Sequence, residues 1–290
     1  MKKIFTTMIV GLSLTLVSIV HAEGMLQVKG SDTQVNLVQR LAEVYMESNP
    51  GSAIAVTGGG SGTGVAALIN GKCDIANSSR LMKPKEISMA EESGKDVKRV
   101  VIAIDGLSVI TNPGSGVDKL TVDEIAAIFR GEITNWSEVG GPDSPITLYG
   151  RQSNSGTFQF FQDEILKGDY SQKMNHMNGN SQIVEAVKAD RSGIGYVGIG
   201  YLNDVQGITI VHVAPRKGAE YADPTITENV ITGKYPISRP LNQYIQGSPT
   251  GLAKAFIAFE LSPEGQKVVE EEGFYAIPAE YKELNTLAGF

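Results

Sequence analysis

The sequence predicts an α/β protein built of two lobes. Stretches with strand-like and helix-like apolar patterns alternate along nearly the whole chain, which is typical of strands joined by helices. The chain has 290 residues, and because one core stops growing efficiently at about this size, two bodies of roughly 100–150 residues each are expected. With 41% apolar and 20% charged residues, the composition is that of an ordinary globular protein.

The first 22 residues are expected to be a signal peptide that lies outside the fold. Lys2 and Lys3 form a basic start, the stretch 4–20 is apolar, and Ala22 is the small residue after which a signal peptidase would cut. A permanent membrane anchor needs about 20 apolar residues, and this stretch is shorter and interrupted by Ser and Thr. We therefore expect an exported protein.

Charge and cysteine content exclude several classes of protein. The chain carries 25 Lys and Arg against 32 Asp and Glu, a net charge of −7, and loss of the two signal-peptide lysines leaves 23 basic against 32 acidic residues. Nucleic acids and anionic membrane surfaces are poor partners for such a charge. Cys73 is the only cysteine, so neither an internal disulfide nor a cysteine-based metal site is possible, and we expect its side chain to be buried as a small apolar group.

In the first part of the chain, three strands are each followed by a helix. The strands are expected at Met25–Lys29, Ala53–Thr57 and Cys73–Ala76. The first helix should end at Asn49-Pro50-Gly51 and the third should begin at Pro84. The second helix carries the apolar residues Val65, Leu68 and Ile69. Two apolar runs follow, at Val97–Ile104 and Leu107–Thr111. Only Asp105-Gly106 separates them, so they form either one hairpin or a strand that leaves one sheet and enters another.

The second part continues the alternation. After a helix from Leu120 to Gly131, we expect strands at Ile146–Tyr149, Ile194–Val197 and Ile208–Val213, and helices at Thr157–Leu166, Ile183–Ala189, Leu252–Leu261 and Pro263–Glu271. Tyr235-Pro236 and Arg239-Pro240 are expected to be rigid crossover segments, with Arg239 as a candidate for an ion pair between the lobes.

Four loops rich in Gly, Ser and Thr are the candidates for function. They are Gly30-Ser31-Asp32-Thr33, Gly58-Gly59-Gly60-Ser61-Gly62-Thr63-Gly64, Asn77-Ser78-Ser79-Arg80 and Arg151-Gln152-Ser153-Asn154-Ser155-Gly156-Thr157. A helix N-terminus offers unpaired N–H groups and partial positive charge, hydroxyls add donors, and glycine allows close approach. Taken singly, each loop is more readily explained by helix capping or a turn than by ligand binding. Together they predict a site for a small, multiply charged oxyanion, whereas neither a P-loop nor a dinucleotide motif is present.

Six segments carry a resemblance to a known family. They are Gly30-Ser31-Asp32-Thr33, Gly58-Gly59-Gly60-Ser61-Gly62, Asp74-Ile75-Ala76-Asn77-Ser78-Ser79-Arg80, Phe129-Arg130-Gly131-Glu132-Ile133-Thr134-Asn135-Trp136, Arg151 with Ser155-Gly156-Thr157, and Gly193-Ile194-Gly195-Tyr196-Val197. In this order, and over essentially the whole mature chain, the sequence resembles the periplasmic phosphate-binding proteins of ABC transporters. The resemblance implies a two-lobed periplasmic-binding-protein fold of type II, in which each lobe is a mixed sheet flanked by helices. It also implies a monomer that holds phosphate in the inter-lobe cleft and delivers it to an inner-membrane permease.

Carried over residue by residue, the resemblance implies a set of phosphate ligands and two lobes. The ligand residues would be Ser31, Asp32, Thr33, Ser61, Ser79 with Arg80 nearby, Arg151, Ser153, Ser155, Gly156 and Thr157. The lobes would comprise residues 23–105 plus 235–290, and residues 106–234. Ser79 and Ser153 stand where certain relatives have an aspartate, so the resemblance alone does not identify the source of anion selectivity.

Asp32 is the candidate acceptor for a phosphate proton, because it is the only carboxylate in the four loops. Sulfate has no such proton and would meet like charge there. The alternative is that Asp32 caps the Gln34–Met46 helix. Arg151 supplies a fixed charge whose fork matches two oxygens, and it could pair with an acidic neighbour as well. Sulfate, molybdate or an organic phosphate remains an alternative ligand, and a sensor or scavenger without a permease remains an alternative role.

An enzymatic function is not expected. His176 and His212 are the only histidines after the signal peptide, and neither lies in a motif typical of a catalytic triad or a zinc site. Ser61 is not in a G-x-S-x-G turn, because position 63 is threonine. We expect neither a metal nor a cofactor. Trp136 is expected to anchor a turn, His176 to lie in an exposed loop and His212 to lie half-buried on a strand.

Overall fold

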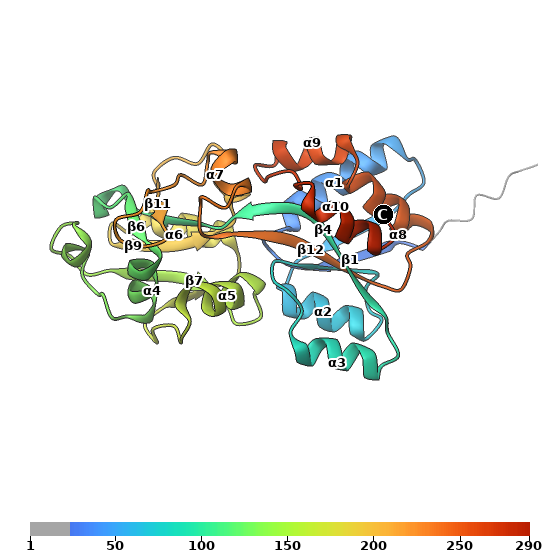
Figure 1. Ribbon diagram of the computed structural model, residues 1–290, viewed down its shortest axis with the longest axis horizontal. Coiled ribbons are helices and arrows are strands. Elements are labelled where there is room, and N and C mark those ends of the chain that lie inside the picture. The colour runs from blue at the N-terminus through green and yellow to red at the C-terminus, as the bar shows by residue number, and fades with distance from the viewer. Residues whose placement is uncertain (1–23) are drawn as a thin grey trace, which may run out of the picture.

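The computed structural model describes residues 24–290, so the expected signal peptide lies outside the described residues. Two lobes lie side by side along the longest axis and are joined by long crossing strands (Figure 1). Over the described range, none of the helices combines the length and the apolar character that crossing a membrane requires.

The first lobe is a mixed five-stranded sheet between helices. Its strands, in spatial order, are β2 (Ile54–Thr57), β1 (Leu26–Gly30), β3 (Ile75–Ser78), β12 (Ser238–Gln246) and β4 (Val97–Gly106). β1 is parallel to β2 and β3, whereas β12 is antiparallel to β3 and β4. On one side lie α1 (Val35–Ser48), α8 (Gly251–Glu260), α9 (Pro263–Glu271) and α10 (Glu280–Leu287), and on the other lie α2 (Ser61–Ile69) and α3 (Pro84–Glu92) (Figure 1).

The second lobe is also a mixed sheet with helices around it. Its strands, in spatial order, are β10 (Thr209–Ile210), β5 (Ser108–Thr111), β9 (Gly193–Val197), β7 (Thr147–Arg151) and β8 (Asn175–Met177), beside a two-stranded sheet of β11 (His212–Ala214) and β6 (Lys119–Thr121). Its helices are α4 (Val122–Arg130), α5 (Gly156–Phe160), α6 (Asn180–Ala189) and α7 (Thr227–Ile231). The two-lobed α/β architecture that the alternation predicts is confirmed.

The chain passes between the lobes on two adjacent strands. β4 ends at Gly106 in the first sheet, and β5 begins at Ser108 in the second. The hairpin alternative is therefore wrong, because β4 pairs with β12 while β5 pairs with β9 and β10. The return crossing is β12, in which Arg239 lies directly opposite Asp105 of β4. The two crossings thus form one antiparallel ribbon at the junction.

Several elements differ from expectation. The expected helix Thr157–Leu166 consists of α5 followed by a π-helical segment, Phe161–Leu166, and the expected strand Ile208–Val213 is divided between β10 and β11 in different sheets. His176 lies on edge strand β8 and not in a loop. β12 is a nine-residue strand where only a rigid crossover was expected. Asn242 and Gln243 are buried polar residues of β12, so the strand lacks the alternation of apolar and polar residues that predicts a strand.

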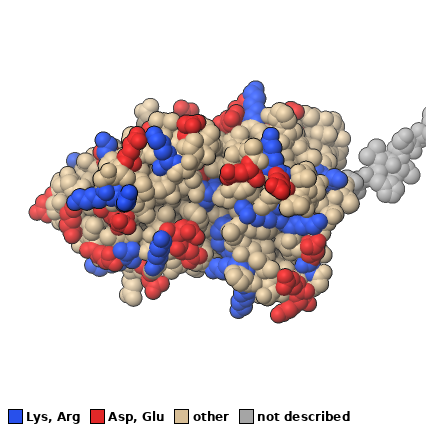
Figure 2. Space-filling view, in the orientation of Figure 1, with Lys and Arg blue, Asp and Glu red and all other residues tan. Residues whose placement is uncertain are grey.

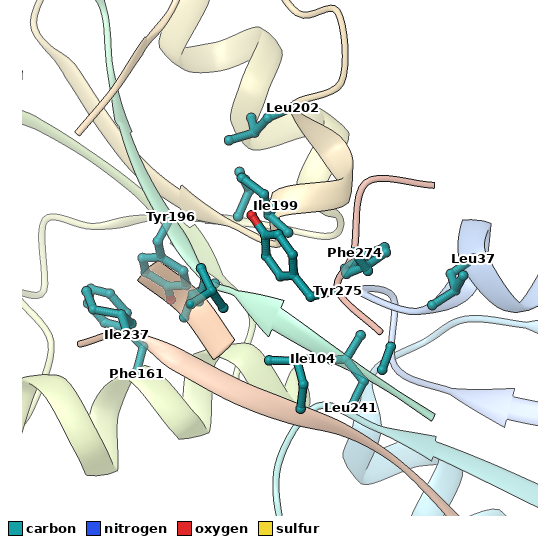
Figure 3. Packing of buried hydrophobic residues seen from close by; sticks show 14 of the residues in the cluster. Leu37, Ile104, Phe161, Tyr196, Ile199, Leu202, Ile237, Leu241, Phe274 and Tyr275 are labelled. Carbon is teal, nitrogen blue, oxygen red and sulfur yellow. The ribbon is translucent and has the colours of Figure 1, made fainter. Parts of the chain in front are cut away.

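Apolar packing continues through the junction of the lobes. Figure 3 shows Ile104 and Leu241 of the crossing strands beside Tyr275 and Phe274 of the C-terminal region and Ile199 of the second lobe. Ile104 and Tyr275 also exchange main-chain hydrogen bonds, with N···O distances of 2.8 and 3.0 Å. The core of one lobe is therefore continuous with that of the other behind the loops that face the cleft.

Three single-residue expectations are confirmed. Trp136 is fully buried at a turn, where its indole Nε1 donates to Ser192 O at 3.1 Å. Cys73 is buried, and burial raises the pKa of its thiol to about 11, so the thiol is protonated at neutral pH. His212 is partly exposed on β11.

Candidate anion-binding site

All four Gly/Ser/Thr-rich loops meet where the lobes face each other. Three of them follow β1, β2 and β3 of the first lobe, and the fourth follows β7 of the second. Direct hydrogen bonds cross the gap: Gly62 N donates to Asn154 O at 3.1 Å, and Asn154 Nδ2 donates to Gly59 O at 3.0 Å. The predicted convergence of the loops is therefore present, with the lobes in contact.

Glycine is required in the loop between β2 and α2. Gly59 and Gly60 have φ angles of 110° and 89°, a region that other residues rarely adopt. A Cβ atom on Gly60 would also lie 2.5 Å from Asn154 O of the opposite lobe. These two residues let the chain turn sharply and place Ser61 as the first residue of α2, where its N–H has no partner within the helix.

Four buried hydroxyls, which we call the hydroxyl chain, run across the site. Ser61 Oγ lies 3.4 Å from Ser79 Oγ, Ser79 Oγ lies 3.4 Å from Thr157 Oγ1, and Thr157 Oγ1 lies 2.8 Å from Thr33 Oγ1. Each hydroxyl has one proton to donate, so three contacts use at most three of the four protons. At least one proton of the hydroxyl chain is therefore available to a ligand.

Gly156 closes this part of the site from the second lobe. A Cβ atom there would lie 2.2 Å from Ser61 Oγ and 2.8 Å from Ser79 Oγ, so a side chain would displace the hydroxyls. Ser155 has the capping role: its Oγ accepts from Thr157 N at 3.1 Å and from Phe158 N at 3.3 Å. Ser155 thus holds the start of α5 in place while Gly156 brings the main chain close to the first lobe.

Arg151 is a buried cation with unused donors. Only 1% of the residue is exposed, and its Nη2 bonds to the Asp32 carboxylate and to Asn178 O, the latter at 2.9 Å. Its Nε and Nη1 are buried without any partner, and the buried Ser31 Oγ is in the same state. Because an unsatisfied buried donor costs about 1–3 kcal/mol, and more when charged, such groups are typical of a site that awaits an acceptor.

Asp32 connects the fixed charge to the glycine loop. Its Oδ1 accepts from Gly59 N at 2.7 Å, and its Oδ2 pairs with Arg151. The capping alternative is not what the structure shows, because the N-cap of α1 is Gln34 and carries no side-chain capping bond. Of the two roles weighed for Arg151, the acidic pair is present and still leaves two guanidinium nitrogens free.

Two residues of the predicted ligand set are not brought into the site. Arg80 forms a two-pronged pair with Glu86, with both N···O distances at 2.7 Å, and also donates to Leu81 O at 2.8 Å. Its guanidinium is therefore directed toward α3. Ser153 is exposed to solvent, two residues before the capping Ser155.

The structure adds a second buried arginine that the ligand set did not include. Arg239 Nη2 donates to Thr157 Oγ1 at 2.9 Å, and its Nη1 donates to Ser79 O at 3.0 Å. Its Nε and Nη2 also hold Asp105 Oδ2, at 3.0 and 2.8 Å, so the expected pairing role of Arg239 is present. No pattern along the chain indicates its contact with Thr157.

Formal charges within the site cancel. Arg151 pairs with Asp32, and Arg239 pairs with Asp105. An anion would therefore be held chiefly by N–H and O–H donors and by the N-termini of α1 and α2, in a setting where water is largely excluded. On the face drawn in Figure 2, basic side chains gather where the two lobes meet. Within residues 24–290, no group of three or more His, Cys, Asp or Glu side chains is placed to hold a metal ion.

The sequence is similar to a known superfamily and to proteins named for phosphate binding. Residues 20–264 match the family model for a PBP superfamily domain. The chain is 32% identical to the phosphate-binding protein PstS of Pseudomonas aeruginosa, over 90% of this chain and 85% of the relative, and 35% identical to PstS of Bacillus subtilis, over 88% and 82%.

Solved structures agree with the sequence relatives. A "Putative Phosphate ABC Transporter Substrate-Binding Protein with Bound Phosphate" from Clostridium perfringens has a TM-score of 0.78 and 28% identity, and covers 88% of this chain and 100% of its own. An ABC-type phosphate transport receptor from Vibrio cholerae has a TM-score of 0.71 and 27% identity, covering 87% and 100%. The chain therefore belongs to the PstS family of phosphate-binding proteins, within the PBP superfamily.

Proposed function

We propose that this protein captures inorganic phosphate between its lobes and delivers it to an ABC permease. The observation that carries the proposal is the pair of buried, unpartnered guanidinium nitrogens on Arg151, together with the buried, unpartnered Ser31 hydroxyl of the first loop. The relatives are named phosphate-binding proteins, which supports a binding role and not an enzymatic one.

Each part of the site has a separate task in this proposal. Arg151 offers the unpartnered N–H groups of Nε and Nη1 to phosphate oxygens as charge-assisted donors. Ser31 and the hydroxyl chain donate to the remaining oxygens, and the N–H groups at the start of α1 and the Ser61 N–H at the start of α2 add donors without adding charge. The ligand is thus held mainly by hydrogen bonds from both lobes.

Asp32 is proposed to read the proton that phosphate keeps near neutral pH. Each carboxylate oxygen has already accepted one hydrogen bond, from Gly59 N or from Arg151, and has capacity for a second. A phosphate O–H can donate to that remaining lone pair, whereas fully ionised sulfate offers only like charge. Ser79 and Ser153 do not supply a carboxylate, so Asp32 would carry the discrimination alone.

Transport follows if the lobes open and close around the ligand. We propose that residues 23–105 with 235–290 move as one body and residues 106–234 as the other, about the ribbon of β4 and β12. A ligand that contacts both lobes favours the closed state. We further propose export to the periplasm after cleavage behind Ala22, a monomeric state, and a permease that recognises the closed form.

The test is calorimetric titration of the purified protein with phosphate and then sulfate. We expect phosphate to bind and to be preferred to sulfate. Arg151→Ala should weaken phosphate binding about 100-fold or more, because two charge-assisted bonds are lost at about 1.5–3 kcal/mol each. Arg216→Ala, at an exposed position of the second lobe, is the matched control and should leave the affinity unchanged.

Asp32→Asn tests selectivity in the same titration. It should reduce the preference for phosphate over sulfate, and an unchanged ratio would remove the proton-reading role from Asp32. If the protein binds sulfate or molybdate and gives no heat with phosphate, the ligand assignment is wrong, although the oxyanion site would stand.

A further inference from the structure

We propose that Arg239 is a positioning residue for anion capture: it orients the Thr157 hydroxyl so that its proton points into the site. This inference rests on the proposed function and concerns a residue that does not itself contact the ligand. It is based on the position of Arg239 on β12, on its fixed partner Asp105, and on the direction of the hydrogen bond that it makes to Thr157.

Arg239 is held rigidly at the junction of the lobes. It is 3% exposed and lies opposite Asp105, which is fully buried. Two of its nitrogens contact Asp105 Oδ2, while Asp105 Oδ1 accepts from Ile199 N of the second lobe at 3.0 Å. The Phe160 ring of α5 lies 5.0 Å from its guanidinium carbon, a cation–π contact. The guanidinium is therefore fixed from both lobes at once.

From this position, Arg239 reaches both sides of the site. Its Nη1 donates to the Ser79 carbonyl of the first lobe, and its Nη2 donates to Thr157 Oγ1 of the second. Both bonds have ordinary lengths, 3.0 and 2.9 Å. Arg239 thus sits behind the hydroxyl chain, on the side of Thr157 that faces the crossing strands.

The direction of the bond to Thr157 is fixed by chemistry. A guanidinium only donates, so Thr157 Oγ1 must accept there, and its own proton is directed elsewhere. The alternatives are Thr33 Oγ1 at 2.8 Å, Ser79 Oγ at 3.4 Å or a bound anion.

A second fixed donor acts on Ser61, which is one end of the hydroxyl chain. Ser79 N donates to Ser61 Oγ at 3.1 Å, so Ser61 also accepts from a group that cannot reverse the bond. With a fixed donor on Ser61 and another on Thr157, each of these hydroxyls must direct its own proton to a different acceptor, and a bound anion is one. A hydroxyl that accepts a charge-assisted bond is also polarised into a stronger donor.

Lysine would not substitute for arginine in this role. Its single ammonium can keep the ion pair with Asp105, but it lacks the planar fork that spans Asp105, Ser79 O and Thr157 together. Arg239→Lys therefore separates the charge of the pair from the orientation of Thr157. This makes it the informative variant.

The experiment is a double-mutant cycle on phosphate affinity with Arg239→Lys, Thr157→Val and the double variant. If Arg239 acts through the Thr157 hydroxyl, we expect Arg239→Lys to weaken phosphate binding about tenfold and Thr157→Val about 30-fold. Each loss corresponds to the free energy of no more than a few hydrogen bonds. The double variant should then match Thr157→Val alone. Arg99→Lys is the matched control, because Arg99 lies on neighbouring β4 and its Nε donates to Asn242 instead.

The possible outcomes are distinct. If the double variant loses about 300-fold, the two losses multiply and the positioning role is overturned, because an effect of Arg239 that is independent of the Thr157 hydroxyl persists when that hydroxyl is removed. An unchanged phosphate affinity in Arg239→Lys would also overturn it. Absence of phosphate binding by the wild-type protein would instead overturn the proposed function. Far-UV circular dichroism confirms folding of each variant, and if Arg239→Lys does not fold, Asp105→Asn replaces it in the same cycle.

Discussion

Arg151 and Arg239 are both buried at the junction of the lobes and both pair with an aspartate, yet their guanidinium groups are used in opposite ways. Every nitrogen of Arg239 has a protein partner, whereas Nε and Nη1 of Arg151 have none. Both arginines contact residues of the four Gly/Ser/Thr-rich loops, so burial alone does not distinguish a cation with donors to spare from one whose donors are all used. The distinction lies in the donors that remain unpaired.

The aspartate partners differ in the same sense. Asp105 is fully buried, and burial raises the pKa of its carboxyl and lowers the pKa of the Arg239 guanidinium, so each group depends on the other to stay charged. The Asp32 side chain is 19% exposed and also holds Gly59 N. The Asp105–Arg239 pair is therefore fully enclosed by the fold, whereas the Asp32–Arg151 pair is partly open to solvent.

The largest effect on stability is expected from removing Arg239. Arg239→Met leaves Asp105 buried without its counter-ion and should lower the free energy of unfolding by about 3–5 kcal/mol. Arg151→Met should cost clearly less, because Asp32 retains solvent and a main-chain donor. Urea denaturation without phosphate measures both, and equal losses for the two variants would contradict the distinction.

The sequence pointed to Arg151 as a candidate for the site and indicated only part of what surrounds Arg239. Arg151 is the last residue of β7 and opens a loop whose Ser, Gly and Thr residues lie at the same site, so the information is local. The partners of Arg239 are 82 residues away at Thr157, 134 at Asp105 and 160 at Ser79. No pattern along the chain encodes such contacts, and β12 itself lacks the apolar alternation that indicates a strand.

A buried carboxyl group far from these loops shows that buried atoms without a partner do not by themselves mark a binding site. Glu260 Oε2 and Gln243 Oε1 are both buried without a partner, while Gln243 Nε2 donates to Glu260 Oε1 at 3.0 Å. Burial raises the pKa of Glu260 to about 8, so the group is mostly protonated at pH 7. A proton on Oε2 can donate to Gln243 Oε1, which would satisfy both atoms within the first lobe and leave nothing for a ligand.

The stability of the protein should therefore depend on the Glu260 proton. The unfolded carboxyl group titrates near its ordinary value of 4.5, so folding is favoured by the proton below that pH, and the advantage is lost progressively as pH rises toward 8. At pH 7, Glu260→Gln should raise the free energy of unfolding relative to wild type by about 2–3 kcal/mol, and by much less at pH 4.5. Denaturation midpoints at the two pH values measure the difference. A gain that is the same at both would show that packing, and not the proton, is responsible.

The smallest effect is expected at Arg80, the arginine that the sequence placed near the ligand and the structure pairs with Glu86. Its donors are already committed to Glu86 and to Leu81 O, so it resembles Arg239 more than Arg151 in the use of its nitrogens. Arg80→Gln should change phosphate affinity less than threefold and lower the free energy of unfolding by about 1 kcal/mol, since the Glu86 side chain is 19% exposed and also accepts from Lys83 N. Titration beside Arg151→Ala provides the comparison. A loss of affinity as large as that of Arg151→Ala would mean that Arg80 exchanges Glu86 for the anion on binding, and the rule that paired donors do not bind ligand would fail at this site.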